Sequence, residues 1–337
     1  MLLTFSLFLL SAAAIYFACE YFVNGIEWVG RQMSLGSTAT GSVLAAFGTA
    51  LPETAVTFAA VVFGVNDAQR DIGVGAALGG PLVLATIAYA LVGGALLVNR
   101  QRLGRADSQL KVDCSKLATD QFWFIAIFTV KVSLGLMTFA FKPVLGVMFL
   151  GAYALYVWRE IRSSGAKPED TEELKPLKFR RHDTAPARHW ALLQSGLALL
   201  VITVASKVFV GQLEQIGHFF GLSAQLVALL LSPVATELPE AMNALIWVRQ
   251  GRERLALANI SGSMMIQGTV PTALGLFFTP WRLDPALVVS AVYTGAATLL
   301  LFLQFRRRRI TGWQLLPAGL LYVAFAATLA FLNAVRR

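Results

Sequence analysis

The chain has 337 residues, of which 56% are apolar and only 14% are charged, and its mean hydropathy is +0.64. Soluble domains carry about 25% charged residues, so this composition excludes a large soluble domain and predicts an all-α polytopic membrane protein. Two cysteines far apart in the sequence and three histidines without ligand spacing indicate neither a disulfide nor a zinc site.

Apolar runs predict ten membrane-spanning helices. They cover residues 2–30, 38–63, 71–98, 121–138, 143–161, 190–216, 223–248, 255–279, 284–305 and 313–334. The first run lacks a basic leader and a small-residue cleavage site, so we interpret it as a retained helix rather than a signal peptide. Residues 162–189 are rich in Pro, Lys and Glu and predict a solvated linker. This linker separates a first five-helix repeat (1–161) from a second (190–337).

The net charge of +9 is distributed unevenly. With ten spans the connections alternate between sides, and most of the 28 lysines and arginines fall on one side. The positive-inside rule makes that side cytoplasmic and both termini extracytoplasmic, in the plasma membrane or the bacterial inner membrane. The basic excess therefore sets topology, and we expect no nucleic-acid partner. Lys131 and Lys207 fall inside spans but close enough to an end to reach the interface, and we assign them no role.

One phrase occurs twice within apolar spans: "GTALPE" ends at Glu53 and "ATELPE" ends at Glu240. An acidic side chain at the centre of a membrane helix costs about 2.5–3.5 kcal/mol on insertion scales, so such residues are functional candidates by default. Each glutamate follows a helix-breaking proline, Pro52 or Pro239. Interrupted helices at corresponding positions of two halves are typical of the ion site of a transporter.

The two phrases belong to a longer internal repeat. Residues 22–53 align without a gap on residues 209–240, which superimposes both Leu-Pro-Glu motifs. One helix later, "GAALGG" (75–80) aligns with "ANISGS" (258–263). Because each half holds an odd number of spans, the second repeat enters the membrane from the opposite side. Such inverted repeats place their substrate site near the bilayer midplane, where the halves meet.

Proline also supplies oxygen ligands, because its missing N–H frees the carbonyl oxygen four residues earlier. The freed carbonyls are those of Gly48, Ala235 and Leu229, which correspond to Pro52, Pro239 and Pro233. Thr49 and Thr236 lie four residues before the repeated glutamates and share their helix face. Carbonyl, hydroxyl and carboxylate oxygens are hard ligands that suit Na⁺, Ca²⁺ or Mg²⁺.

Other polar residues need separate interpretations. Glu237 lies one turn before Glu240, roughly on its face, and we interpret it as a further ligand or a proton acceptor. Glu27 and Glu214 lie near helix ends, where solvation is easy, so a structural role is favoured. For Thr49 alone, a hydrogen bond to its own helix backbone is an equally good interpretation.

These motifs resemble those of the sodium/calcium exchanger family of the cation/calcium antiporter superfamily, in which G-T-S-L-P-E is followed one helix later by G-N-x-x-G-S-N. The resemblance covers residues 22–84 and 209–267. It implies ten helices and alternating access, with the first and sixth helices sliding across a fixed core. The implied ligands are Glu53, Glu240, Thr49, Thr236, Ser263 and Gln267, with Asn259 also retained and backbone carbonyls near Ala46 and Pro233.

The sequence departs from the family pattern at several ligand positions. Ala50 and Glu237 replace the serine after each threonine, and Gly80 and Leu84 replace a serine and an asparagine of the third helix. Gln267 occupies an acidic or amide position. Three carboxylates in one cavity cannot all ionise cheaply without a cation, so we expect some to be protonated when the site is empty. Protons are therefore candidate exchanged or competing ions.

We predict a secondary antiporter that exchanges a divalent cation, Ca²⁺ first, against Na⁺ or H⁺, with inorganic cations and the lipid bilayer as partners and no cofactor. The alternatives are exchange of monovalent cations with protons, exchange of Mg²⁺ or Mn²⁺, or a non-transporting ion sensor. Hydrolase, zinc-protease and prenyl-transfer motifs are absent from the sequence, so we do not expect an enzyme.

Overall fold

The computed structural model describes residues 2–32, 37–105, 107–139, 141–163, 176–183, 186–307 and 309–335. Within these ranges the chain is mostly helical and contains no β-strand. An isolated bridge joins Gln109 to Thr311. For the described chain, the prediction of an all-α protein is confirmed.

The first half of the chain forms long helices with short connections. They are α1 Leu2–Gln32, α2 Ser37–Phe63, α3 Asp67–Val83, α4 Tyr89–Asn99, α5 Cys114–Leu136 and α6 Lys142–Ser163. A π-helical turn, Leu84–Ala88, joins α3 to α4 in one continuous rod. α3 and α5 begin before the predicted apolar runs because Asn66 and Asp113 cap them, each side chain accepting from a first-turn backbone N–H.

The second half begins after the 3₁₀ turn Lys178–Arg180. Its helices are α7 Arg188–Phe220, α8 Ala224–Thr236, α9 Leu238–Arg249, α10 Glu253–Phe278, α11 Pro285–Phe305 and α12 Gly312–Val335. The predicted run 223–248 is thus divided at Glu237, where Pro239 cannot donate to the carbonyl of Ala235. By contrast, α2 continues through Pro52.

Six helical segments of the described chain are long and apolar enough to cross a membrane. They are Leu2–Ile26, Asp67–Asn99, Cys114–Leu136, Arg188–Phe220, Pro285–Phe305 and Gly312–Leu332. α10 is not among them, although nearly every one of its turns is buried, because it carries many polar and small residues. The chain is therefore a membrane protein in which α10, with its many polar and small residues, lies inside the bundle.

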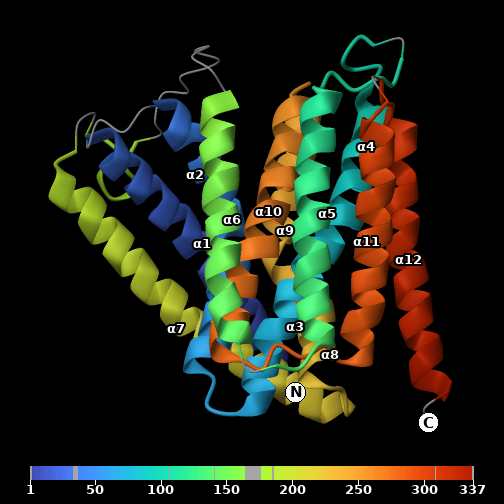
Figure 1. Ribbon diagram of the computed structural model, residues 1–337. Helices are drawn as coiled ribbons and strands as arrows, with labels where there is room; N and C mark the ends of the chain where they lie inside the picture. The colour runs from blue at the N-terminus through green and yellow to red at the C-terminus, as the bar shows by residue number, and fades with distance from the viewer. Residues whose placement is uncertain are drawn as a thin grey trace.

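The helices form two groups. α1 and α7 lie side by side and slant away from the other helices in Figure 1. Their contact includes Phe8 and Phe209, whose stacked rings are 4.9 Å apart. The larger apolar cluster is built mainly from α3 to α5 and from α9 to α12. α10 runs through its middle and contacts α2, α3, α5, α6 and α9.

α3 packs directly on α8 through two glycines one turn apart. A Cβ atom at Gly75 would overlap the carbonyl oxygen of Gln225, and one at Gly79 would lie 2.7 Å from that of Leu229. Small residues at this spacing let membrane helices approach backbone to backbone. The carbonyl of Leu229 is the one that Pro233 frees, so one of the two close approaches of α3 and α8 is at a proline.

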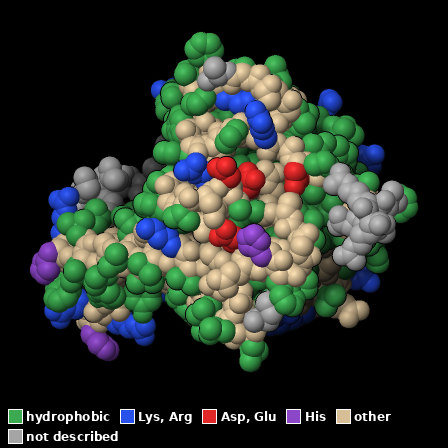
Figure 2. Space-filling model, turned by 90° about the horizontal axis from the view of Figure 1, so that it is seen from below, with side chains coloured by type: hydrophobic (Ala, Val, Ile, Leu, Met, Phe, Trp, Pro, Cys, Tyr) green, Lys and Arg blue, Asp and Glu red, His purple; other side chains and the backbone are tan. Residues whose placement is uncertain are grey.

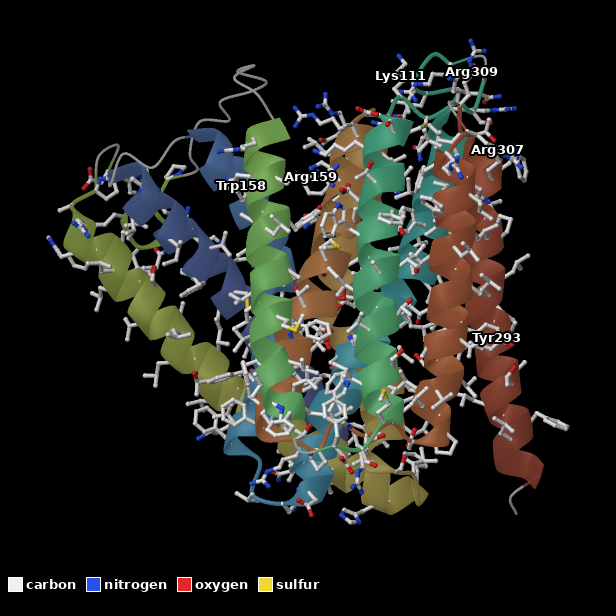
Figure 3. The ribbon with its side chains drawn as sticks, viewed as in Figure 1. Lys111, Trp158, Arg159, Tyr293, Arg307 and Arg309 are labelled. Atoms are coloured by element: carbon white, nitrogen blue, oxygen red, sulfur yellow. The ribbon has the colours of Figure 1, made fainter. Side chains whose placement is uncertain are left out.

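Charged side chains are distributed differently at the two ends of the bundle. The labelled basic residues all lie at the upper end in Figure 3, namely Lys111, Arg159, Arg307 and Arg309. Figure 2 shows the lower end, where acidic side chains gather near the middle of the face. At the helix starts on this end, the Gln225 amide donates to Asp71 at 3.2 Å and accepts from the backbone N–H of Asp284 at 3.0 Å. α1 begins and α12 ends at the lower end (Figure 1).

Candidate functional site

Three carboxylates lie buried inside the bundle. Glu53 belongs to α2, Glu237 occupies the break between α8 and α9, and Glu240 lies in the first turn of α9. Their exposed fractions are 0%, 1% and 0%. The Thr236 hydroxyl donates to Oε2 of Glu53 at 2.7 Å and lies 3.3 Å from Oε1 of Glu237. One hydroxyl of the second half thus connects carboxylates from both halves of the chain.

The break in α8 explains how Glu237 enters this group. Glu237 ends α8 with φ −98° and ψ −8°, and its N–H still donates to the carbonyl of Pro233 at 2.9 Å. α9 then restarts with a proline in its first turn, a position where the missing N–H costs nothing. Glu240 therefore lies close to the N-terminus of α9, which favours negative charge.

Gln267 of α10 completes one wall of the group. Its side-chain amide donates to Oε1 of Glu237 at 2.8 Å, and the residue is fully buried. A Cβ atom at Gly80 of α3 would lie 2.7 Å from Oε1 of Gln267 and 3.1 Å from Oε1 of Glu237. The glycine that replaces the family serine therefore leaves the space that the longer glutamine fills.

A helix glycine that accommodates a neighbour should not tolerate a methyl group. Gly80→Ala is expected to lower stability by about 1–3 kcal/mol, because the new Cβ overlaps the Gln267 amide. The thermal unfolding midpoint of the purified protein measures this loss. Gly94→Ala is the matched control, since its nearest neighbouring atom lies 3.9 Å away and alanine favours helix. Equal midpoints for the two variants would contradict the crowding at Gly80.

Several buried oxygens of the group have no hydrogen-bond partner among the described residues. They are Oε1 of Glu53, Oε2 of Glu237, both carboxylate oxygens of Glu240 and Oε1 of Gln267. Buried polar atoms are normally hydrogen-bonded, so oxygens that the described residues leave unpaired are candidate ligands of a bound ion. Oxygen ligands of this kind suit a hard cation.

The carboxylates alone do not form a chelating cluster. Within the described residues, no group of three His, Cys, Asp or Glu side chains converges on one point. Neutral oxygen atoms would therefore have to complete the coordination of a bound cation. Ser263 is fully buried, and Ser232, which the sequence did not single out, is buried beside Glu53. Pro52 and Pro233 are buried as well.

Some predicted site residues lie outside the described side chains. They are Thr49, Ala46, Gly48, Ala235 and Pro239, which occupy helical positions in α2, α8 and α9. Of the positions where family ligands are replaced, Ala50 and Leu84 are fully buried, and Leu84 belongs to the main apolar cluster. At this position the α3 side of the group therefore provides hydrocarbon instead of an oxygen ligand.

Lys131 is fully buried, so the prediction that it reaches the membrane interface is wrong. Its Nζ donates to the carbonyl of Ala77 at 2.6 Å and lies 3.4 Å from that of Gln267. Lys207, in contrast, is exposed, with its Nζ 4.1 Å from the ring centre of Phe63. Both lysines lie in apolar runs, and only the packing of α5 and α7 distinguishes the inward side chain from the outward one.

Long apolar helices around a buried centre of carboxylates and unpaired oxygens define an integral membrane transport protein. A family model described as "Sodium/calcium exchanger protein" matches residues 3–162 and 190–332. The chain belongs to the sodium/calcium exchanger family.

The relatives of the chain agree with this placement. The candidate antiporter CaxA of Alkalimonas amylolytica is 26% identical over 95% of this chain and 98% of its own length. The inner membrane protein YrbG of Escherichia coli is 25% identical over 85% of this chain and 83% of its own length.

Solved structures share the fold. An H⁺/Ca²⁺ exchanger, CAX, superimposes with a TM-score of 0.73 over 97% of this chain and 82% of its own, at 18% identity. The sodium-calcium exchanger NCX_Mj gives a TM-score of 0.59 over 97% of this chain and 98% of its own, at 21% identity. At these identities the likeness establishes the fold alone.

Proposed function

We propose that the protein is a secondary antiporter that exchanges a divalent cation, with Ca²⁺ as the leading candidate, against Na⁺ or H⁺. The observation that carries the proposal is the buried group Glu53, Glu237 and Glu240, which joins both halves of the chain and leaves carboxylate oxygens unpaired among the described residues. Charges at this depth are retained where they serve ion pathways. The family membership and the exchangers named among the similar structures support the same activity.

Each residue of the group has a proposed role. Glu53 and Glu240 are the central ligands, and Glu237 is a further ligand or a proton acceptor. The neutral side-chain ligands are Thr49, Thr236, Ser263 and Gln267. The backbone ligands are the carbonyls of Ala46, Gly48, Pro233 and Ala235, which lie near the prolines Pro52 and Pro239. Carboxylates compensate for the water that a cation loses on binding, and neutral oxygens complete its coordination.

The architecture proposed for this activity is ten transmembrane helices in two inverted five-helix repeats, residues 1–161 and 190–337, joined by the linker 162–189. α1 and α7 slide across the remaining helices and expose the site to alternate sides. The slant of α1 and α7 away from the other helices in Figure 1 supports this division. The basic upper end would face the cytoplasm and both termini the opposite side of the plasma or bacterial inner membrane.

Transport by purified protein in lipid vesicles tests the proposal. Vesicles loaded with Na⁺, or acidified inside, are expected to accumulate ⁴⁵Ca²⁺ against its gradient, and Glu53→Gln vesicles are expected not to. If neither the Na⁺ gradient nor the H⁺ gradient drives ⁴⁵Ca²⁺ uptake, the Ca²⁺ assignment is overturned. Stabilisation by Ca²⁺ without flux would instead point to an ion sensor.

A second candidate changes the transported ion. At two positions where the family has oxygen ligands, Leu84 provides a hydrocarbon side chain and Gly80 provides no side chain. This loss favours an ion that needs fewer ligands than Ca²⁺. Exchange of Na⁺ or K⁺ with protons, or exchange of Mg²⁺ or Mn²⁺, would satisfy this. In the same vesicles, ²²Na⁺ or ⁵⁴Mn²⁺ uptake that exceeds ⁴⁵Ca²⁺ uptake at least tenfold would establish the second candidate.

A further inference from the structure

Two prolines create the surroundings of the Lys131 ammonium group. Pro81 lies inside α3, and its missing N–H leaves the carbonyl of Ala77, four residues earlier, without its helical partner. Pro271 lies inside α10 and does the same to the carbonyl of Gln267. These are the two carbonyl oxygens that Nζ of Lys131 approaches, at 2.6 and 3.4 Å.

Aromatic rings surround the rest of this ammonium group. Nζ of Lys131 lies 5.8 Å from the ring centre of Phe128 and 5.9 Å from that of Trp281. The Trp281 indole N–H donates to the carbonyl of Lys131 at 3.1 Å, which holds the ring in place. Ring faces and free carbonyls both attract cations. The surroundings are those of a cation site, and its cation is covalently attached to α5.

This ammonium group is electrostatically coupled to the three buried carboxylates described above. Gln267 links the two, because its carbonyl faces Lys131 while its side-chain amide donates to Glu237 at 2.8 Å. Lys131 also interacts electrostatically with Glu53. Inside a protein of low dielectric constant, charged groups that contact the same bridging residue affect one another strongly.

We propose that the Lys131 ammonium group is a fixed cation of the site and limits the total positive charge of the transported ions that bind there. This inference rests on the proposed cation transport. Three ionised carboxylates and one ammonium group have a net charge of −2, which one divalent or two monovalent cations neutralise. Without Lys131 the same group has a charge of −3 and requires an additional cation or proton.

Cation titrations of the purified, full-length protein test the role of Lys131. Thermal unfolding at pH 7.0 is followed as CaCl₂, NaCl, KCl, MgCl₂ or MnCl₂ is added. Lys131→Met is expected to tighten binding of the stabilising cation at least tenfold. Glu237→Gln is expected to weaken it, and the double variant, with a net charge of −2 again, to return to within about threefold of the wild type. Lys207→Met, which removes an exposed lysine of α7, is expected to behave as the wild type does.

A purely structural lysine predicts a different result. If Lys131 only satisfies two carbonyls, Lys131→Met lowers the unfolding temperature while cation affinity stays unchanged or falls, which overturns the inference. If Lys131→Met does not fold, the double variant decides: recovery of folded protein shows that uncompensated charge was the cause, and failure shows lost hydrogen bonds. If no cation stabilises the wild type, the proposed function itself fails.

Discussion

Glu240→Gln is expected to reduce cation transport at least about 100-fold and, at the same time, to stabilise the cation-free protein. Neither oxygen of Glu240 has a hydrogen-bond partner among the described residues, and the side chain is fully buried. Glutamine has no charged form whose burial is unfavourable, so the substitution is expected to gain about 1 kcal/mol or more. Stabilisation by cation at 100 times the dissociation constant, worth about 2.7 kcal/mol, should disappear.

The two opposite effects distinguish an ion ligand from a structural carboxylate. Thermal unfolding with and without Ca²⁺ measures stability, and vesicle uptake measures transport. Glu214→Gln is the matched control, because Glu214 also lies in a membrane helix but at the rim, where it accepts from Asn66 and Gln69 at 2.8 and 2.7 Å. A Glu240→Gln protein that is less stable without Ca²⁺ but still transports would rule out a ligand role.

Arg105→Ala is expected to lower stability by about 3–5 kcal/mol, a larger loss than that expected for Gly80→Ala. Arg105, in the connection between α4 and α5, pairs with Glu253 at the start of α10 at 2.6 Å, and their side chains are 10% and 0% exposed. Removing the guanidinium leaves a buried carboxylate without its counter-charge. The unfolding midpoint of the purified protein measures the loss.

The paired variant separates the ion pair from general damage to this connection. Arg105→Met combined with Glu253→Met should recover most of the lost stability, since apolar residues of similar size can replace a buried ion pair. Arg102→Ala, which removes an exposed arginine three residues away, should change the midpoint little. Equal losses for Arg102→Ala and Arg105→Ala would refute this role of the pair.

Residue chemistry was sufficient to predict the all-helical membrane chain and the family. Long apolar runs can satisfy their backbone inside a bilayer only as helices or closed barrels, so the elements follow from composition. Glu53, Glu237 and Glu240 were recognised because charge is rare in such runs. Their burial agrees with that expectation, whereas the ligand roles remain predictions.

Other features depend on tertiary contacts that no local pattern reveals. The burial of Lys131 depends on which face of α5 meets α3 and α10. The space left by Gly80 has meaning only beside the Gln267 side chain. Pro81 and Pro271 each indicate a free carbonyl, but the sequence does not show that one ammonium group reaches both. Likewise, α2 runs on through its Leu-Pro-Glu motif at Pro52, whereas the helix of the second motif breaks before it at Glu237. Whether the helix breaks depends on its neighbouring helices.

The break at Glu237 has a consequence for the direction of the proposed transport cycle. In a protein made of two equivalent inverted repeats, exchanging their conformations turns one end state into the other, and both have equal free energy. Here the helix is divided before the motif at Glu237 but runs on through Pro52. In the proposed cycle, the inward-open and outward-open states would therefore not be mirror images. A difference of about 1.4 kcal/mol between them would already leave the resting protein ten to one in favour of a single side.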